Sequence, residues 1–338
     1  MVTYVIRRIL FFIPVLFAVS MFTFVLMRSL PGGPFDFVGD RPLPPVIVAN
    51  MNAKYHLDWP MWKQFVSYVI GDELLGGTGE AQGIIRGDFG ASMFYRNQSV
   101  TGLIRQSFPI SAQLGIMATA LAIIMGVPLG ILAALKQNSW IDYGSTFLAV
   151  FFLSVPNLVL APLLIWIFAL QLGWLPVAGW GAQKDFVLGF LPNPADWNVE
   201  YLQHAILPVF ALGTASAAGI ARLTRGSLLQ VVREDYIRTA RAKGLRERVV
   251  IAVHALKNSL IPVVTILGPL FAGLVTGTFV VEQIFGINGM GKHFIASVGN
   301  RDYPLLLGAT LIYAVLLVIA NLVVDISYAW LDPRIRYD

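Results

Sequence analysis

The apolar residues of the chain gather into six long runs that are separated by polar connections. The runs lie at Ile9–Met27, Pro109–Leu135, Tyr143–Leu170, His204–Leu223, Leu260–Val281 and Pro304–Ala329. An α-helix rises about 1.5 Å per residue, so about 20 apolar residues cross a hydrocarbon core of about 30 Å. A transmembrane β-barrel would instead show alternating segments of about ten residues. The pattern therefore predicts an all-α polytopic membrane protein with six transmembrane helices.

The first run could also be read as a cleavable signal peptide, because Arg7 and Arg8 precede it. The apolar segment of a signal peptide spans only about 7–15 residues and ends at a small-x-small site. This run is longer and is followed by Pro31-Gly32-Gly33-Pro34. We therefore expect a transmembrane helix that is not cleaved.

Composition supports the membrane assignment and narrows the chemistry. Only 13% of the 338 residues are charged, whereas soluble domains carry about 25%. The chain has no cysteine, so disulfides, thiolate catalysis and cysteine-based metal sites are excluded. The net charge of +5 could indicate nucleic acid, but the basic residues concentrate in one connection between helices. That distribution indicates membrane orientation and no nucleic-acid partner.

That connection, residues 222–258, is called the basic loop below. It contains nine Lys or Arg and three acidic residues. Basic residues favour the cytoplasmic ends of membrane helices. An orientation with both termini inside puts the basic loop in the cytoplasm together with Arg7, Arg8, Lys136, Arg334 and Arg336. The loop after the first run is then external, and at about 80 residues it is long enough to translocate despite its charge.

The predicted organisation has four parts. Residues 1–28 form the N-terminal transmembrane helix, and 29–108 form an external loop subdomain with a short helix at Pro60–Val69 and a turn at Arg86–Ser92. Residues 109–329 form a core of five transmembrane helices that includes the basic loop, and 330–338 form a cytoplasmic tail.

Small residues mark the helices expected to pack most closely. The fourth run contains Ala211–Ala221, which is built almost entirely from alanine, glycine, serine and threonine. Small residues let helix backbones approach one another in lipid, so this run is expected at the centre of the bundle. Gly126-x-x-x-Gly130 and Gly273-x-x-x-Gly277 predict similar faces. Pro156, inside the third run, is one of several prolines expected to bend a helix.

No catalytic constellation is visible. Gly286–His293 resembles a phosphate-binding loop, but His293 replaces the Ser or Thr that would hold Mg²⁺, and no strand precedes it. A turn at the external surface is the better interpretation. His204, Glu282 and Asp325 lie in or beside apolar runs and are candidate pathway or gating residues. A local hydrogen bond for His204, and a basic partner for each carboxylate, are the structural alternatives.

The basic loop contains Glu234-Asp-Tyr-Ile-Arg-Thr-Ala-Arg-Ala-Lys-Gly244-Leu245, followed by Val253–Asn258 and Ile261-Pro262. This string closely resembles the EAA-type coupling loop of ABC importer permeases, and more narrowly the B-type permease subunit of the dipeptide/oligopeptide family. Other matches to that subunit are Arg7-Arg8, Pro31–Pro34, Gly87–Ser92, Arg222-x-x-Arg225, Glu282–Phe285, Gly289-Met-Gly291, Arg301–Pro304 and Asp332–Arg336. The resemblance covers essentially the whole chain.

The chain departs from the family pattern at a few positions. The Glu of the general EAA pattern falls at Arg238 and its first Ala at Thr239, which is typical of the peptide-transport branch. Gly33 stands where the family usually has an acidic residue. A glycine-rich insertion near Gly76–Gly83 has no assigned role.

The resemblance implies a type I ABC importer permease fold and a transport subunit that is not an enzyme. Expected partners are a C-type sister permease, two cytosolic ABC ATPases, an extracytoplasmic binding protein, peptide substrate and membrane lipid. The chain would bind no cofactor, with ATP and Mg²⁺ on the ATPases, and would lie in the cytoplasmic (inner) membrane of a prokaryote. The implied ATPase-coupling residues are Tyr236, Arg238, Thr239, Ala240, Arg241, Ala242, Lys243, Gly244 and Leu245. Gly244 is expected to end their helix.

Other functions remain open at this point. Nickel and glutathione-like importers share much of the pattern. A secondary transporter driven by an ion gradient is disfavoured because the runs lack multiple central acidic residues. An integral membrane enzyme would need a catalytic constellation that the sequence does not show.

Overall fold

The computed structural model describes residues 2–29, 32–35, 44–77, 79, 81–181, 186–187, 191–192 and 198–331. Pro31, Lys184 and the tail motif Asp332–Arg336 lie outside these residues. The described chain is overwhelmingly helical, which confirms the predicted all-α class. One detail was not predicted: two-residue strands β1 (Phe186–Val187) and β2 (Leu191–Pro192) pair antiparallel in the connection before the fourth run.

Five segments of the described chain are long and apolar enough to cross a membrane. They are α1 (Val2–Ser29), α4 (Val100–Leu135), α7 (Val199–Val231), α11 (Ile261–Val275) continued by α12 (Phe279–Ile284), and α14 (Tyr303–Leu331). Helices α4 and α7 have 36 and 33 residues, well beyond the length that the hydrocarbon core requires. Both are therefore longer than a perpendicular crossing of the hydrocarbon core requires.

The third apolar run forms two helices that are bent sharply against each other, at the proline that was expected to bend it. It divides into α5 (Trp140–Ser154) and α6 (Asn157–Leu164), which is continued by the π-helical turn η3 (Ile165–Gln171). The two halves meet at an angle of 103°. Pro156 lies at the break, where it lacks the N–H of a continuing helix. The described residues therefore contain five candidate spans, or six if the bent pair counts as one.

Helices α4 and α7 form the centre of the bundle through contacts between their backbones. A Cβ atom on Gly126 would lie 2.6 Å from the carbonyl oxygen of Ala217, and one on Gly130 would lie 2.5 Å from that of Ala221. Only glycine permits such an approach. The predicted central position of the fourth run and the Gly126-x-x-x-Gly130 face are both confirmed. In the second predicted pair, a Cβ atom on Gly277 would lie 2.4 Å from the Gly291 backbone nitrogen, whereas Gly273 has open space beside it among the described residues.

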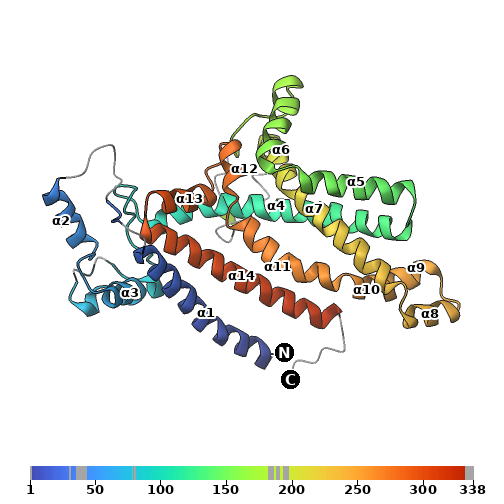
Figure 1. The fold of residues 1–338 in the computed structure, drawn as a ribbon, viewed down its shortest axis with the longest axis horizontal. Coiled ribbons are helices and arrows are strands. Elements are labelled where there is room, and N and C mark those ends of the chain that lie inside the picture. Colours follow the sequence, from blue (N-terminus) through green and yellow to red (C-terminus); the bar gives the residue numbers. More distant parts are fainter. Residues whose placement is uncertain are drawn as a thin grey trace.

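Helices α1 and α14 pack antiparallel along one side of the bundle (Figure 1). At one end Arg8 forms an ion pair with Asp325, with 2.6 Å between Nη2 and Oδ2. At the other end the Arg28 guanidinium lies over the Tyr303 ring, 4.7 Å from its centroid. The first residues of α1 and the last turns of α14 therefore lie at the same end of the bundle.

The remaining elements lie at the two ends of the long axis (Figure 1). At one end are α2 (Pro45–Lys54), α3 (Met61–Ile70), η1 (Glu73–Leu75), η2 (Ile84–Arg86) and α13 (Met290–Gly299). At the other end are α8 (Asp235–Ala242), α9 (Glu247–Val249), η5 (Val250–Ala255) and α10 (Leu256–Ser259). Helix α3 confirms the short helix predicted at Pro60–Val69.

Asp302 fastens the segment before α4 to the start of α14. Its buried carboxylate accepts a hydrogen bond from the Ser92 hydroxyl and one of 3.1 Å from the Met93 backbone N–H. It also lies within 3.4 Å of the Leu305 N–H in the first turn of α14, where a carboxylate stabilises the free amides of a helix N-terminus. A single residue therefore caps the last span and anchors the loop.

We expect Gly130→Ala to destabilise the purified chain by about 1–3 kcal/mol, because its methyl group would force α4 and α7 apart. Gly144→Ala on α5 is the matched control, since nothing lies within 4 Å of a Cβ at Gly144. The measurement is the thermal unfolding midpoint in detergent. Equal midpoints for the two variants would contradict the backbone contact.

Candidate functional site

The centre of the basic loop folds into the two-turn helix α8. Its first turn is stabilised by a hydrogen bond of 2.9 Å from the Thr239 hydroxyl to the Asp235 carbonyl. Gly244 follows the helix with φ of +75°, a conformation that glycine adopts without strain. Its N–H donates to the Arg241 carbonyl at 2.9 Å. The expected end of the helix at Gly244 is confirmed.

One face of α8 is buried against its own chain. Ile237 is fully buried and Ala240 is 6% exposed. Both pack into an apolar cluster with Ala134 at the end of α4, Leu228 on α7, and Val250, Ile251 and Ala255 of η5. Residues three apart share a helix face, so this pair seats α8 on the ends of the two central helices. Ile237 was not among the predicted site residues. Its position three residues before Ala240, on the same helix face, was the sequence signal that could have identified it.

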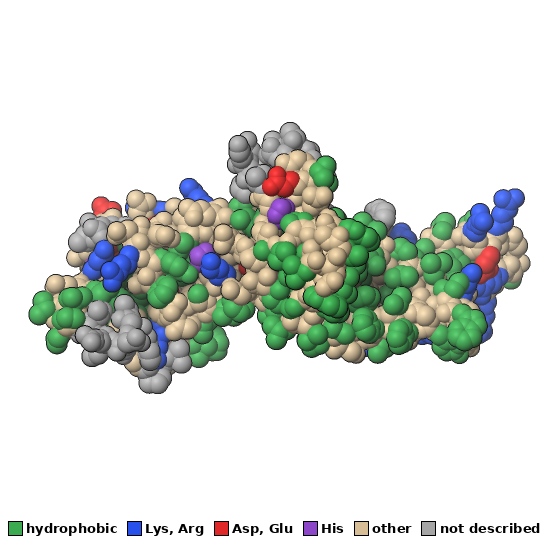
Figure 2. All heavy atoms as spheres, turned by 90° about the horizontal axis from the view of Figure 1, so that it is seen from above, with side chains coloured by type: hydrophobic (Ala, Val, Ile, Leu, Met, Phe, Trp, Pro, Cys, Tyr) green, Lys and Arg blue, Asp and Glu red, His purple; other side chains and the backbone are tan. Residues whose placement is uncertain are grey.

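The other face of α8 points away from the protein. The exposed predicted residues on the helix are Tyr236, Arg238, Thr239, Arg241 and Ala242, and those just after it are Lys243, Gly244 and Leu245. Tyr236 is 40% exposed and Leu245 is 41% exposed, which leaves two apolar side chains uncovered within a basic surface. Figure 2 shows Lys and Arg side chains gathered at this end of the molecule beside hydrophobic ones. Of the nine predicted coupling residues, Ala240 is therefore buried against the chain itself and the other eight are exposed.

Polar contacts hold the loop around α8 in one shape. Arg241 binds Glu247 through two hydrogen bonds, of 3.2 Å from Nε and 2.8 Å from Nη2. These hydrogen bonds lower the pKa of Glu247 below its usual value, so the pair stays ionised above that lowered pKa and is lost as the pH falls through it. Asn258 donates to the Tyr236 hydroxyl at 2.8 Å. Hydrogen bonds therefore connect both the first and the last turn of α8 to the segment that follows it, α9 to α10.

A buried ion pair braces the helices above the loop. Arg225 of α7 binds Asp142 of α5 in a bidentate contact, 2.6 Å from Nε to Oδ1 and 2.8 Å from Nη2 to Oδ2. The Asp142 side chain is only 3% exposed, and the Asn138 N–H adds a third hydrogen bond of 3.0 Å. Such a fork fixes geometry as well as charge. It links the start of α5 to the last turns of α7, within the first residues of the basic loop.

Glu282 does not line an open path and has no basic partner among the described residues. It is fully buried, and its carboxylate accepts hydrogen bonds from the Ser111 hydroxyl at 2.7 Å, the Thr278 N–H at 3.2 Å and the Gly291 N–H at 2.9 Å. A Cβ atom on Gly289 would collide with this carboxylate. The glycines of the sequence Gly286–His293 therefore enclose a carboxylate of the same chain. Glu282 is a structural centre that joins α12 to α4 and α13.

The other two candidate pathway residues each have a partner within the chain. Asp325 pairs with Arg8, as the structural alternative proposed. The Nδ1 atom of His204 lies 2.8 Å from the Glu200 carbonyl oxygen one turn earlier in α7. Within the part of the chain that the structure describes, no three His, Asp or Glu side chains form a group that could hold a metal ion.

The fold and this surface define a helical membrane protein that presents a short basic helix on the ends of its two central spans. Residues 126–337 match the model of the binding-protein-dependent transport system inner membrane component, and residues 1–115 match the model of its N-terminal region. Together these matches cover almost the whole chain. The protein belongs to this family of transport-system membrane components.

Relatives and solved structures agree with the family. The chain is 43% identical over 100% of both sequences to the oligopeptide transport system permease protein OppB of Escherichia coli K12. It is 40% identical to the dipeptide transport system permease protein DppB of Bacillus subtilis 168, over 99% of this chain and 98% of that one. It also resembles a chain of the inward-facing MetNI methionine ABC transporter, with a TM-score of 0.51 and 14% identity over 68% of this chain and 96% of that one. The last likeness concerns the fold alone.

Replacing Arg225 by Met should leave the buried Asp142 carboxylate without compensation. We expect the free energy of unfolding to fall by about 2–3 kcal/mol. This value is at or below the low end of the losses seen for fully buried ion pairs, because the Arg225 side chain is 31% exposed. The double variant Arg225→Met/Asp142→Leu should recover most of that loss. Thermal unfolding of the purified chain measures both, with the exposed Arg222→Met as control. A double variant no more stable than Arg225→Met alone would contradict the bracing role.

Proposed function

We propose that the chain is the transmembrane permease subunit of an ATP-driven importer that moves dipeptides or oligopeptides across the cytoplasmic membrane. The observation that carries the proposal is the apolar cluster that joins α8 and η5 to the ends of α4 and α7, the most closely packed helices of the bundle. Full-length identity of 40–43% to oligopeptide and dipeptide permeases supports the peptide substrate. The family description supports delivery by a separate binding protein.

The chain works with a sister permease, and its own surface supports this. Gly219 and Gly226 on α7 have no atom within 4 Å of an added Cβ, in contrast to the tightly packed glycines that face α4. The two glycines line a cavity of about 480 Å³. Its other lining residues include Arg222 and Gln230 of α7 and Ile266 of α11. An uncovered stripe of small residues on a membrane helix suits a second helical subunit. The transport path then lies between the two subunits.

The exposed surface of α8 docks on a cytosolic ATPase subunit, where ATP and Mg²⁺ are bound. Tyr236 and Leu245 provide apolar anchors, and Arg238 and Lys243 meet an acidic partner surface. Movement of the ATPase displaces α8, and the buried contacts of Ile237 and Ala240 pass that displacement to α4 and α7 because packed side chains transmit strain. The chain itself is a transport subunit and catalyses nothing.

The orientation follows from this assignment. The basic loop and both termini face the cytoplasm, residues 29–108 form the external subdomain, and 330–338 form a cytoplasmic tail. The arrangement agrees with the Lys and Arg bias between connections. It also agrees with the positions of α8 and of α2 and α3 at opposite ends of the molecule (Figure 1).

Gly244→Asp should abolish peptide uptake while the protein still inserts in the membrane. The side chain would strain a backbone at φ of +75° and place a carboxylate within the docking surface. Gly76→Asp is the matched control, because Gly76 has φ of +78° and equally open surroundings but lies at the opposite end. Uptake of a labelled peptide panel by whole cells is the measurement. Normal uptake by Gly244→Asp would sink the coupling role.

Charge and apolar contact contribute to docking in separable ways. Arg238→Ala and Lys243→Ala should reduce ATPase co-purification relative to the unchanged chain at low salt. This difference should become smaller when salt is raised, because the Debye length falls from about 10 Å at 0.1 M to about 3 Å at 1 M. Loss in Tyr236→Ala or Leu245→Ala should persist at both concentrations. Val253→Ala, an exposed residue of η5, is the control. Unchanged co-purification in all four variants would rule out this surface as the ATPase seat.

The driving force has its own test. Vesicles that contain this chain, its sister subunit and the ATPases, with the binding protein and peptide outside, should take up peptide only when ATP is supplied inside. Uptake that instead follows a proton or sodium gradient without ATP would identify a secondary transporter. Uptake of nickel or glutathione, and not of peptide, would show that the chain serves an importer for a different substrate within the same family.

A further inference from the structure

The external end of the bundle contains a polar cavity that the transport function does not use. It has a volume of about 410 Å³, within the usual range for small-molecule sites. Its walls come from the end of α1, the start of α14 and the segment between α1 and α4. Exposed residues such as Lys54 and Gln98 are among those that line it, so it reaches solvent.

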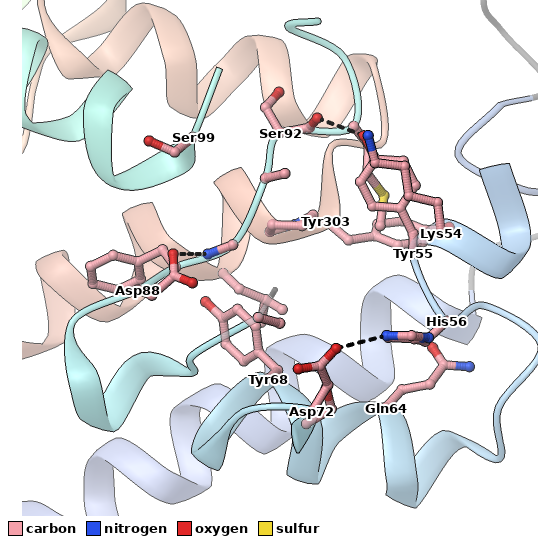
Figure 3. A pocket seen from close by; sticks show the side chains of 18 of the residues that line it. Lys54, Tyr55, His56, Gln64, Tyr68, Asp72, Asp88, Ser92, Ser99 and Tyr303 are labelled. Atoms are coloured by element: carbon pink, nitrogen blue, oxygen red, sulfur yellow. Dashed lines mark hydrogen bonds and ion pairs between the residues drawn. The ribbon is translucent and has the colours of Figure 1, made fainter. Parts of the chain in front are cut away.

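Four residues that line this cavity each have a buried polar atom without a hydrogen-bond partner: Arg28 Nε, Gln64 Oε1, Tyr68 OH and Asp72 Oδ1. Buried polar groups are normally paired, and an unpaired one costs about 1–3 kcal/mol. Figure 3 shows Tyr68 beside Asp72, whose other oxygen lies 3.1 Å from His56 Nε2. Asp72 is only 1% exposed. The cavity is therefore built for a polar ligand.

The unpaired atoms specify the charge of that ligand. Arg28 Nε donates a hydrogen bond and carries positive charge, and burial raises the pKa of Tyr68, so its hydroxyl remains a donor. Asp72 Oδ1 is a carboxylate oxygen and can only accept a hydrogen bond. The unpaired atom of Gln64 is its amide oxygen, also an acceptor, because the amide nitrogen already donates to two backbone carbonyls. Two donors suit an anionic group and two acceptors suit an ammonium group. A ligand with both groups, a zwitterion, would satisfy all four atoms.

An apolar groove adjoins the polar cavity on its membrane side. It has a volume of about 720 Å³ and is lined almost entirely by hydrophobic side chains of α1, α4, α14 and the segment between α1 and α4. Phe89 lines both spaces, and Ser20 and Leu311 of the groove lie one helical turn from Phe24 and Leu307 of the cavity. From Ser20 to Ile13 the groove follows α1 for seven residues, about 10 Å, into the apolar span.

We propose that the two spaces together bind one phospholipid whose headgroup carries a phosphate and a primary ammonium. The phosphate accepts hydrogen bonds from Arg28 and Tyr68, with Lys54 at the rim. The ammonium donates to Asp72 and Gln64, and one acyl chain fills the groove between α1 and α14. The order of polar cavity and apolar groove along α1 is the order of headgroup and chain in a lipid leaflet. The site does not rest on the proposed transport function.

The test uses the full chain in a mild detergent, titrated with phosphatidylethanolamine, phosphatidylcholine and phosphatidylglycerol that carry the same acyl chains. Native mass spectrometry counts the bound lipid. Phosphatidylethanolamine should bind about tenfold more tightly than the others, because trimethylammonium has no N–H to donate and glycerol has no positive charge. Equal affinity for all three would overturn the headgroup assignment.

Two variants separate headgroup from chain. Asp72→Asn should remove the preference for phosphatidylethanolamine, whereas Asp58→Asn, an exposed carboxylate outside the cavity, should keep it. Val315→Trp should fill the groove and weaken binding of all three lipids, whereas Ile319→Trp, one turn further along α14 and outside the groove, should not. A preference that survives Asp72→Asn would contradict the proposal.

A soluble probe distinguishes a lipid from a free zwitterion. Glycerophosphoethanolamine has the same headgroup without acyl chains, and it should compete at least about 100-fold more weakly, since each buried CH₂ contributes about 0.8 kcal/mol. Equal competition would show that the cavity takes a soluble zwitterion and that the groove has no part. Unchanged elution of each variant in size-exclusion chromatography is the control for folding.

Discussion

The structure depends on the close approach of two helix backbones. At Gly126 and Gly130 the carbonyl oxygens of α7 lie where any larger residue of α4 would place its Cβ. Lipid supplies little hydrophobic force between helices, so this contact rests on van der Waals packing that only small residues permit. The other spans are arranged around this pair. Its helices, of 36 and 33 residues, are also longer than a perpendicular crossing of the hydrocarbon core requires, which gives the protein a rigid rod between its two ends.

The basic loop acquires its shape from that rod. Helix α8 has eight residues and would not be stable alone, because short helices nucleate at a cost that their few hydrogen bonds do not repay. Burial of Ile237 and Ala240 on the ends of α4 and α7 supplies what is missing. The same contacts that stabilise the helix also fix its position relative to the spans. The same apolar cluster therefore stabilises α8 and connects it mechanically to the spans.

The sequence predicted the elements that depend on local patterns. The long apolar runs, the small-residue face of α7 and the end of α8 at Gly244 follow from periodicity and residue size. The roles of Glu282 and Asp325 did not follow, because their partners Ser111 and Arg8 lie far away in the chain. A carboxylate beside an apolar run looks the same whether it lines a path or stabilises a loop. The bend at Pro156 was expected, but its angle of 103° depends on packing that no local pattern encodes.

Buried polar groups separate into two kinds, and the distinction indicates what each region does. The carboxylates of Glu282, Asp142 and Asp302 each accept several hydrogen bonds from the chain itself. Each therefore stabilises one arrangement of the helices and needs nothing further. Asp72 and Arg28 instead leave an atom unpaired at the wall of a cavity that reaches solvent and adjoins the membrane groove. Other buried polar atoms, such as Gln113 Nε2 and Thr224 Oγ1, also lack a partner, but Arg28, Gln64, Tyr68 and Asp72 differ from them because these four residues line one cavity. That clustering is the reason for proposing a ligand there.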